Sequence, residues 1–220
     1  KYIKQYIKFN KSQHKENKFL NKKDSIILID LFYHPPFIHF WGILANFLIS
    51  KYNVKAKFFY FPLHETRFTK YNFSIYRIKK IYESLNIHEG INEINFKYSF
   101  NNLKLLRKKY LLIKSKKDLQ EFKYKGLKIG DLIYDTYLRT KFKPTINLED
   151  ESLFRIFYRS IKIFDEIHEY FKNNKVKLVI PSHTNYIQYG LIVRIANRKK
   201  IPVVAIHSRN RGNCEFRLKK

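Results

Sequence analysis

The segment from Lys175 to Ser208 constrains the fold more than any other part of the sequence. An apolar run, Val176 to Ile180, is followed by Pro-Ser-His-Thr-Asn, a polar turn sequence that is expected where a buried strand ends. Apolar residues then recur at every fourth position from Ile187 to Ile195, which is the spacing of one buried helical face. A second apolar run follows, Val203 to Ile206. The segment therefore predicts a βαβ unit whose two strands lie parallel in one sheet.

A second βαβ unit is predicted near the start of the chain. The apolar run Ile26 to Leu31 precedes a proline-rich turn, Phe37 to Lys51 has the pattern of a helix that is apolar on most sides, and Lys55 to Phe61 has the pattern of a strand. We therefore expect an α/β fold, with a Rossmann-like parallel sheet flanked by helices, that contains all four strands of the two units. The other predicted elements are helices at Ser74–Asn86, Asn101–Lys114, Leu132–Thr140 and Asp150–Asn173, and a weaker strand at Ile91–Phe96 that follows a helix end near Gly90.

The net charge of +27, with a pI near 10.0, would ordinarily indicate binding to nucleic acid or to an anionic membrane. Lysine is abundant together with asparagine, isoleucine, phenylalanine and tyrosine, the set of residues that an AT-rich genome encodes, and the positive charge is spread along the chain. We therefore attribute most of the charge to codon usage and expect no specific nucleic-acid partner.

The chain has one cysteine, Cys214, so it can form neither an intramolecular disulfide nor a cysteine zinc cluster, and a reducing compartment fits best. The histidines show no ligand-like i, i+4 pair, and we expect no metal site. The Walker loop and the motifs GxGxxG, HExxH and GxSxG are absent from the sequence.

Composition divides the chain into three parts. Residues 1–23 form a basic polar leader without the apolar core of a signal peptide, residues 24–208 form the Rossmann-like domain, and residues 209–220 form a short tail. No run approaches the roughly 18 to 20 apolar residues of a membrane span. The chain begins at Lys1 and contains no methionine, so we expect it to be a fragment whose tail leads towards a second domain.

Two histidines directly follow predicted strands. His34 lies in the turn after the first strand, and His183 lies in the turn after Ile180. Because the carboxyl ends of parallel strands meet at the ligand-binding edge of a sheet, we expect both side chains at a common cleft. Histidine titrates near neutral pH and could act there as a general base, the simpler alternative being a turn histidine that bonds to the backbone.

A second polar cluster is predicted from the sequence GDLIYDTYLR. Asp131, Asp135 and Arg139 recur at i, i+4 and i+8 on one helical face, beside Tyr134. Such a face could bind a sugar or activate a hydroxyl group. The alternatives are that Asp131 caps the helix and that Asp135 and Arg139 form an ion pair.

A third group of candidates lies on the helix of the Lys175–Ser208 unit. Tyr186, Gly190 and Arg194 share one face of this helix, next to its apolar stripe. A glycine inside a helix costs roughly 1 kcal/mol relative to alanine, and two explanations stay open, close packing against the neighbouring strand and room for a ligand. Ser182 or Thr184 is expected to cap the helix.

Three segments carry a family resemblance, LFYHPPFIHFWG, YKGLKIGDLIYDTYLR and VIPSHTNYIQYGLIVRIANRKKIPVVAI. They resemble the amino-terminal half of GT-B-type glycosyltransferases of the kind found in bacterial surface and capsule polysaccharide biosynthesis, and the similarity spans roughly Asp24 to Ser208. In that family two Rossmann-like domains face each other. The first mainly holds the acceptor and often the catalytic base, and the second binds the nucleotide-sugar. The resemblance therefore implies no cofactor in this chain and a nucleotide-sugar donor bound by a second domain.

The resemblance also implies roles for individual residues. His183, Asp135 and His34 would be catalytic. The implied substrate-binding residues are Asp131, Tyr134, Arg139, Tyr186, Gly190 and Arg194. The implied reaction is sugar transfer to a glycan or lipid-linked acceptor, in the cytoplasm or at the inner face of the cell membrane, with peripheral membrane association.

Two other functions remain open at this point. One is a sugar-nucleotide 2-epimerase on the same fold, and the other is a basic module that binds nucleic acid or another anionic polymer. A binding module needs lysines that converge on one face, whereas an enzyme needs a mostly uncharged cleft.

Overall fold

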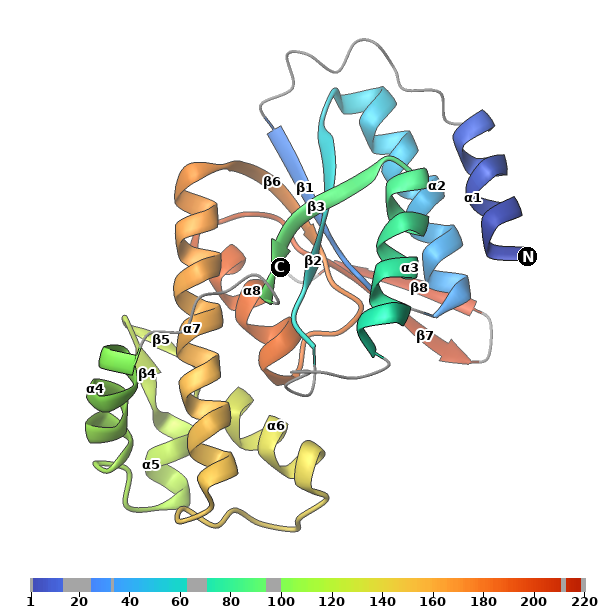
Figure 1. Cartoon of the computed structure of the whole chain (residues 1–220). Helices are drawn as coiled ribbons and strands as arrows, with labels where there is room; N and C mark the ends of the chain where they lie inside the picture. The colour runs from blue at the N-terminus through green and yellow to red at the C-terminus, as the bar shows by residue number, and fades with distance from the viewer. Residues whose placement is uncertain are drawn as a thin grey trace.

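The structure is a computed structural model that describes residues 2–13, 25–32, 34–62, 71–93, 100–210 and 213–218, without the side chains of 71–74, 100–102, 206–210 and 213–218. Its centre is a four-stranded parallel sheet in the order β3-β2-β1-β6 (Figure 1). The strands are β1 (Ser25–Asp30), β2 (Lys55–Tyr60), β3 (Ile87–Asn92) and β6 (Lys175–Ile180). The predicted α/β class, with a Rossmann-like parallel sheet flanked by helices, is confirmed.

Strand β1 lies inside the sheet because its sequence is apolar on both faces. Its side chains alternate between two hydrophobic clusters, with Ile26 and Leu28 in one cluster and Ile27 and Ile29 in the other. All four are buried. Because successive strand residues point to opposite faces, Asp30 lies at the carboxyl end of β1 on the same face as Leu28.

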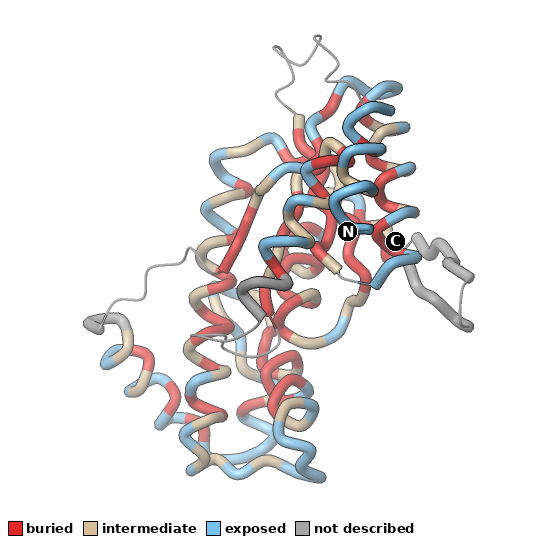
Figure 2. The backbone as a smooth tube through the Cα atoms, turned by 45° about the vertical axis from the view of Figure 1, so that its right-hand side comes forward, coloured by how far each residue is buried: buried red, intermediate tan, exposed pale blue. Residues whose placement is uncertain are grey.

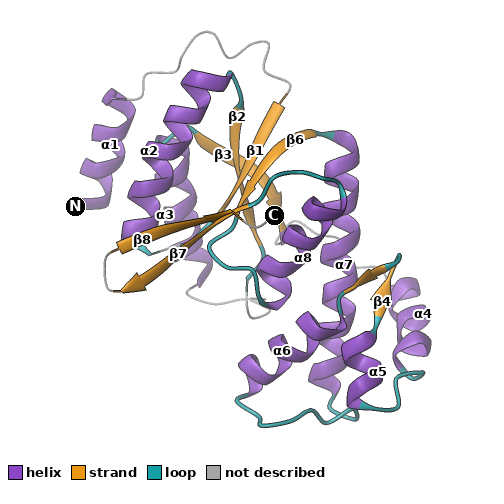
Figure 3. Ribbon diagram, turned by 180° about the vertical axis from the view of Figure 1, so that it is seen from behind, coloured by secondary structure: helices purple, strands orange, loops and turns teal. Residues whose placement is uncertain are grey.

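Helices cover both faces of this sheet (Figure 3). The face of Ile27 and Ile29 packs against α2 (Pro35–Tyr52) and α3 (Tyr71–Ser84). The opposite face packs against α7 (Glu151–Asn173) and α8 (Tyr186–Arg198). The N-cap residue of α7 is Asp150, whose carboxylate accepts a hydrogen bond from Ser152 N–H at 2.8 Å, so the longest helix starts where the sequence predicts.

The strand order reverses beside β1. The chain passes from β1 through α2 to β2 on one side, whereas the long connection after β3 returns it to β6 on the other side of β1. Ligands of open α/β sheets bind outside the carboxyl ends of the strands at such a switch point. The carboxyl ends of β1 and β6 are therefore the expected ligand-binding position.

The connection between β3 and β6 builds a smaller lobe beneath the carboxyl edge of the sheet (Figure 1). Its elements are α4 (Phe100–Tyr110), α5 (Lys116–Glu121), the antiparallel pair β4 (Lys123–Tyr124) and β5 (Leu127–Lys128), α6 (Gly130–Lys141) and the first half of α7. One hydrophobic cluster continues from the sheet through α7 and α8 into this lobe. The lobe and the sheet therefore share a core.

The prediction that Val203 to Ile206 lies in the parallel sheet is wrong. Val203 makes one isolated parallel bridge to Val179, and the chain continues as β7 (Val204–Asn210), which pairs antiparallel with β8 (Asn213–Leu218) in a separate sheet. A short apolar run does not specify which strand will supply its hydrogen bonds. Pro202, which has no N–H to donate, precedes the bridge, and the local hairpin supplies the pairing beyond it.

Strand β3 replaces that segment as the fourth strand, and it begins earlier than the strand predicted at Ile91 to Phe96. Gly90 lies inside β3 and does not end a helix. A Cβ atom at this position would lie 2.8 Å from the carbonyl oxygen of Phe58 in β2, so the close approach of the two strands requires glycine. The part of the prediction beyond Glu93 lies outside the described residues.

Part of the predicted polar leader forms a helix, α1 (Tyr2–Gln13). The Tyr6 hydroxyl lies 2.9 Å from His39 Nδ1 of α2, and the buried Asn10 donates a hydrogen bond to Ser84 Oγ of α3 at 3.1 Å. Helix α1 therefore packs beside α2 and α3 (Figure 1). Within the described ranges, no helix is both long enough and apolar enough to cross a membrane.

Candidate functional site

A carboxylate, a hydroxyl and an imidazole form one chain of hydrogen bonds at the switch point. Asp30 ends β1, and Ser182 and His183 lie in the loop that follows β6. The Ser182 hydroxyl donates to Asp30 Oδ2, and Ser182 N–H reaches the same oxygen at 3.4 Å. His183 Nδ1 lies 2.9 Å from Ser182 Oγ. Neighbouring strands thus bring Asp30 to the adjacent residues Ser182 and His183, although Asp30 and Ser182 are 152 positions apart in the sequence.

Burial changes the acidity of the carboxyl group in this chain. Asp30 is 3% exposed and Ser182 is 1% exposed. Burial raises the pKa of Asp30 from 3.8 to about 7. The hydrogen bonds from the side chain and backbone of Ser182 lower this pKa, but burial is the larger effect. Asp30 therefore changes its charge near neutral pH.

The hydroxyl group of Tyr82 holds the backbone that follows Asp30. It lies 2.9 Å from the carbonyl oxygen of Phe32 and 3.2 Å from that of Asp30, and it accepts a hydrogen bond from Phe32 N–H at 3.0 Å. Tyr82 is fully buried between the sheet and α2. The end of β1 is therefore fixed by a side chain of α3.

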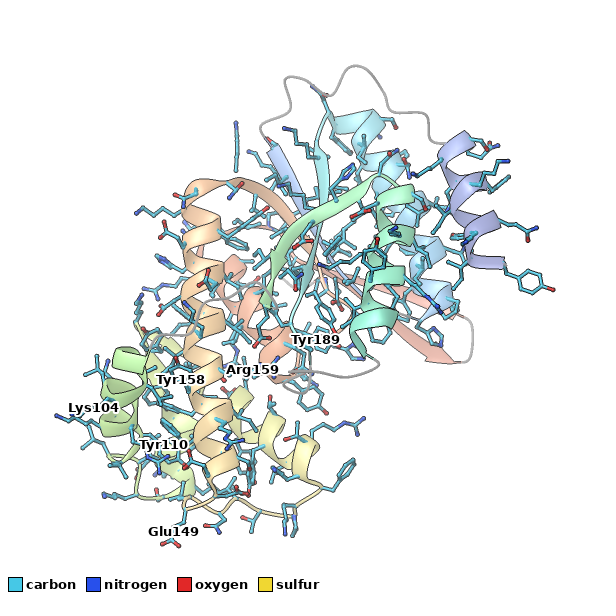
Figure 4. All side chains as sticks on the ribbon, viewed as in Figure 1. Lys104, Tyr110, Glu149, Tyr158, Arg159 and Tyr189 are labelled. Carbon is cyan, nitrogen blue, oxygen red and sulfur yellow. The ribbon has the colours of Figure 1, made fainter. Side chains whose placement is uncertain are left out.

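Aromatic rings surround the two predicted strand-end histidines. The ring of Phe32 lies 5.7 Å from that of His183 and 6.4 Å from that of His34. The His183 ring also lies 5.1 Å from the ring of Tyr189, which Figure 4 labels near the carboxyl end of the sheet. His34 is exposed and is the N-cap residue of α2, without a side-chain capping bond. Both histidines thus lie near Phe32 at one edge of the sheet.

The order of the hydrogen bonds links the charge of Asp30 to the tautomer of His183. An ionised Asp30 only accepts, so the Ser182 proton points to Asp30 and Ser182 Oγ accepts from His183 Nδ1–H. Nε2 is then the unprotonated ring nitrogen. When Asp30 carries a proton it can donate to Ser182, whose own proton then turns to Nδ1, and Nε2 carries the ring proton.

Ser182 is not arranged as a nucleophile. A nucleophilic serine needs access to substrate, and this side chain is almost completely buried between Asp30 and His183. The arrangement instead orients His183 as a group that takes or gives a proton.

No protein-family model, curated protein or solved structure matches this chain. In the ranges that the structure describes, no three His, Cys, Asp or Glu side chains are grouped so that they could hold a metal ion.

Asp131 and Arg194 form a structural ion pair. Arg194 Nη1 and Nη2 donate to the two Asp131 carboxylate oxygens at 2.6 Å each, and Nη1 also donates to the carbonyl oxygen of Lys128 at 2.7 Å. Burial opposes ionisation of Asp131, but the hydrogen bonds and charge of Arg194 outweigh it and lower its pKa. The N-cap residue of α6 is Ile129, so the alternative that Asp131 caps this helix is wrong. This pair joins α6 to α8.

Two further predicted binding residues belong to the core. Tyr134 is 8% exposed and packs in the larger hydrophobic cluster, with Lys116 Nζ 4.8 Å from its ring centre. A Cβ atom on Gly190 would lie 2.6 Å from Leu132 Cδ2. Close packing therefore explains Gly190, although the neighbour is Leu132 of helix α6 and not the adjacent strand.

Asp135, Arg139 and Tyr186 line an open hollow of about 370 Å³, together with Leu138, Phe142 and Asn185. Burial and then the charge of Asp131 raise the pKa of Asp135, and Arg194 opposes this shift. In the described part of the chain no ion pair joins Asp135 to Arg139. The loop between β6 and α8 supplies both His183 and one wall of this hollow, so the two features are neighbours along the chain.

The capping prediction for α8 is wrong. The N-cap residue is Asn185, which makes no side-chain capping bond, and the N–H of Ile187 instead donates to Thr136 Oγ1 of α6 at 2.9 Å. Ser182 is therefore available for Asp30. Helix α6 thus caps α8 from outside.

Asp30 is not among the residues predicted for the site, and Ser182 is predicted only as a possible cap of the following helix. The signal for Asp30 was an acidic residue at the end of an otherwise apolar strand, where burial of a carboxylate is costly. No local spacing connects it to Ser182, because the two residues are 152 positions apart.

The buried carboxyl group predicts an unusual effect of pH on stability. Between 3.8 and about 7 the folded chain holds a proton on Asp30 that the unfolded chain has released. The free energy of unfolding should therefore fall as pH rises through this window, by up to about 4 kcal/mol from this group. Above the window Asp30 is ionised in both states and adds no further slope.

Urea unfolding of the wild type and of Asp30→Asn across this pH range measures the effect. Because asparagine does not titrate, the stability of the variant relative to wild type should increase steadily with pH. Parallel stability curves for the two proteins would show that Asp30 has an ordinary pKa.

Proposed function

We propose that the chain is the acceptor-binding part of a nucleotide-sugar-dependent glycosyltransferase and that His183 is its general base. The observation that carries the proposal is the hydrogen-bonded chain of Asp30, Ser182 and His183 at the switch point of a parallel sheet. It supports proton transfer at the edge where such sheets bind their ligands. The resemblance to GT-B-type enzymes gives the class of reaction.

In the proposed reaction His183 takes the proton of an acceptor hydroxyl group. The acceptor oxygen forms a bond to the anomeric carbon of the donor sugar, and the bond from that carbon to the nucleotide phosphate breaks. The nucleoside diphosphate leaves with the bonding electrons. Asp30 and Ser182 are positioning residues, since they hold the proton of His183 on Nδ1 and leave Nε2 as the basic nitrogen.

We assign acceptor binding to the hollow lined by Asp135, Arg139 and Tyr186. Carboxylate and guanidinium groups can bond to sugar hydroxyls, and the exposed ring of Phe142 offers an apolar surface beside them. For Asp135 we thus propose acceptor binding in place of the catalytic role that the resemblance implies. His34 is assigned to the rim of the site, next to Phe32.

The proposal includes the biological setting that the resemblance implies. The acceptor is a glycan or a lipid-linked glycan of surface polysaccharide biosynthesis, the donor is held by a second Rossmann-like domain, and the reaction takes place in the cytoplasm at the inner face of the cell membrane.

A transfer assay with the complete protein tests this function. A panel of uridine, guanosine and thymidine diphosphate sugars is incubated with lipid-linked and soluble glycan acceptors, and free nucleoside diphosphate and glycosylated acceptor are quantified. The proposal predicts that both products form together. Isomerised nucleotide-sugar without nucleotide release would identify the epimerase alternative, and tight salt-sensitive binding to nucleic acid without turnover would identify the binding module.

A further inference from the structure

The hollow assigned to the acceptor contains two separate charged groups. Asp135 and Arg139 are four residues apart on α6, a spacing that permits an ion pair. Among the described residues, neither the carboxylate of Asp135 nor the guanidinium group of Arg139 forms an ion pair or a hydrogen bond. The neighbouring Asp131 and Arg194, by contrast, are paired with each other. The hollow therefore offers a ligand one anionic group and one cationic group.

Aromatic side chains from two helices line the same hollow. Phe142 is the C-cap residue of α6 and is 86% exposed, and Tyr186 is the first residue of α8. Both have left-handed backbones, with φ of 52° and 61°, a region that bulky residues rarely occupy. Glycine or asparagine would adopt this conformation more easily. Two aromatic residues are thus kept beside the hollow at a local cost, and aromatic side chains can pack against the C–H face of a sugar ring.

The surroundings of Arg139 favour an anion. Lys141 lies in the same last turn of α6, at the start of an exposed stretch, residues 141–145 (Figure 2). Asn185, which lines the hollow, is the N-cap residue of α8 and makes no side-chain capping bond, and the helix dipole is positive at this end. The dipole of α6 is negative at its carboxyl end, where the charges of Arg139 and Lys141 offset it.

We propose that the hollow binds a hexuronic acid residue of the acceptor and that Arg139 selects this sugar by its carboxylate. A planar guanidinium group binds a carboxylate through two parallel hydrogen bonds. Asp135 accepts hydrogen bonds from the ring hydroxyls, and Phe142 packs against the ring. A volume of about 370 Å³ lies near the lower end of the range for small-ligand sites and suits one or two sugar units. This inference rests on the proposed function, because it names the substrate class of the site to which that function assigns the acceptor.

The charge of Asp135 favours a carboxylate over a phosphate as the anionic group of the ligand. A carboxylate carries one negative charge, whereas a phosphate ester carries roughly 1.5 to 2 at neutral pH. Asp135 therefore repels a sugar phosphate more strongly than a sugar acid. A neutral sugar would gain nothing from the charge of Arg139.

Two sugars that differ at one carbon test the selection. Methyl glucuronide has a carboxylate where methyl glucoside has a hydroxymethyl group. The protein is titrated with each sugar at low salt, and NMR signals of the Arg139 Nε–H and the Tyr186 amide give the Kd and locate the site. The wild type should bind the glucuronide at least about fivefold more tightly than the glucoside, the scale of a bidentate pair in an open site. Arg139→Gln should bind the two sugars equally.

The matched control is Arg77→Gln, because Arg77 is exposed on α3, which packs against the opposite face of the sheet from α8. Both variants lower the net charge by one, so a general attraction of anions to the basic protein would affect them equally. Arg77→Gln should keep the preference for the glucuronide. Circular dichroism verifies that both variants fold.

The inference is overturned if the wild type binds the two sugars equally, or if neither sugar shifts the Tyr186 signal. It is also overturned if both variants lose the preference to the same extent, or if methyl glucoside 6-phosphate binds more tightly than the glucuronide. Transfer by the complete protein to a neutral acceptor, with equal binding of both sugars, would keep the proposed function and remove the selection. A preference for the glucuronide that Arg139→Gln abolishes, without transfer to any acceptor, would support the sugar-acid site and remove the proposed function.

Discussion

Replacement of His183 by alanine is expected to lower the rate of sugar transfer by about 10²-fold or more, the scale of a lost general base. The half-buried ring lies against Phe32 and Tyr189 and bonds to Ser182, while Asp30 and Ser182 keep their own hydrogen bond in the variant. The loss should therefore appear in the rate of transfer and not in folding. The measurement is turnover by the complete protein, with circular dichroism and thermal unfolding as folding controls.

The matched control is His88→Ala, because His88 is exposed on the edge strand β3. This variant should transfer sugar like the wild type. Near-normal turnover by His183→Ala would remove His183 from the reaction and leave the buried chain of hydrogen bonds as a structural feature of the loop.

Replacement of Arg159 by leucine is expected to lower the free energy of unfolding by about 3–5 kcal/mol. Arg159 lies on α7 (Figure 4), where Nε and Nη2 donate to the two carboxylate oxygens of Glu93 at 2.5 and 2.6 Å and Nη2 donates to the carbonyl oxygen of Pro62. Arg159 and Glu93 are 3% and 7% exposed. Loss of the arginine would leave a buried carboxylate without this partner at the carboxyl ends of β2 and β3.

Two further variants separate the ion pair from the loss of a large side chain. In Arg159→Leu/Glu93→Leu the uncompensated charge is gone, so the double variant should recover part of the lost stability. Lys128 and Glu121 form an ion pair at 2.7 Å in which both side chains are exposed. Lys128→Ala breaks this pair and should lower the free energy of unfolding by no more than about 1 kcal/mol. Urea unfolding measures the free energies of unfolding. If Arg159→Leu and Lys128→Ala lowered this free energy equally, burial would not be the reason for the large effect expected at Arg159.

The strands that the sequence predicted correctly share one property. The apolar runs of β1, β2 and β6 all contribute buried side chains to the hydrophobic core. Each run is bounded by turn residues or charged residues. The edge strand β3 contains Gly90, which resembles a helix end in the sequence but fits the close approach of β2. Strand β7 could pair either with β6 at the edge of the parallel sheet or with β8 in a local hairpin, and it pairs with β8. An apolar pattern does not indicate which of these two partners a strand will have.

The candidate site could be predicted only in part. Strand-end reasoning indicated the edge at which His34 and His183 lie near Phe32. Helical periodicity identified the face that bears Asp131 and Asp135. It does not reveal which distant residue will pair with that face, and in the structure Arg194 forms an ion pair with Asp131. Polar contacts between distant segments decide which candidates are structural, so they require the fold.

Nitrogen-15 NMR of the imidazole ring of His183 measures its tautomer directly. Above about pH 7, where Asp30 is ionised, the account predicts that Nδ1 carries the proton and Nε2 is unprotonated in the wild type. Ser182→Ala removes the hydroxyl acceptor and should shift the ring towards the tautomer with the proton on Nε2. A wild-type ring that carries its proton on Nε2 above this pH, unchanged in Ser182→Ala, would contradict the role of Asp30 and Ser182 in preparing His183 as a base.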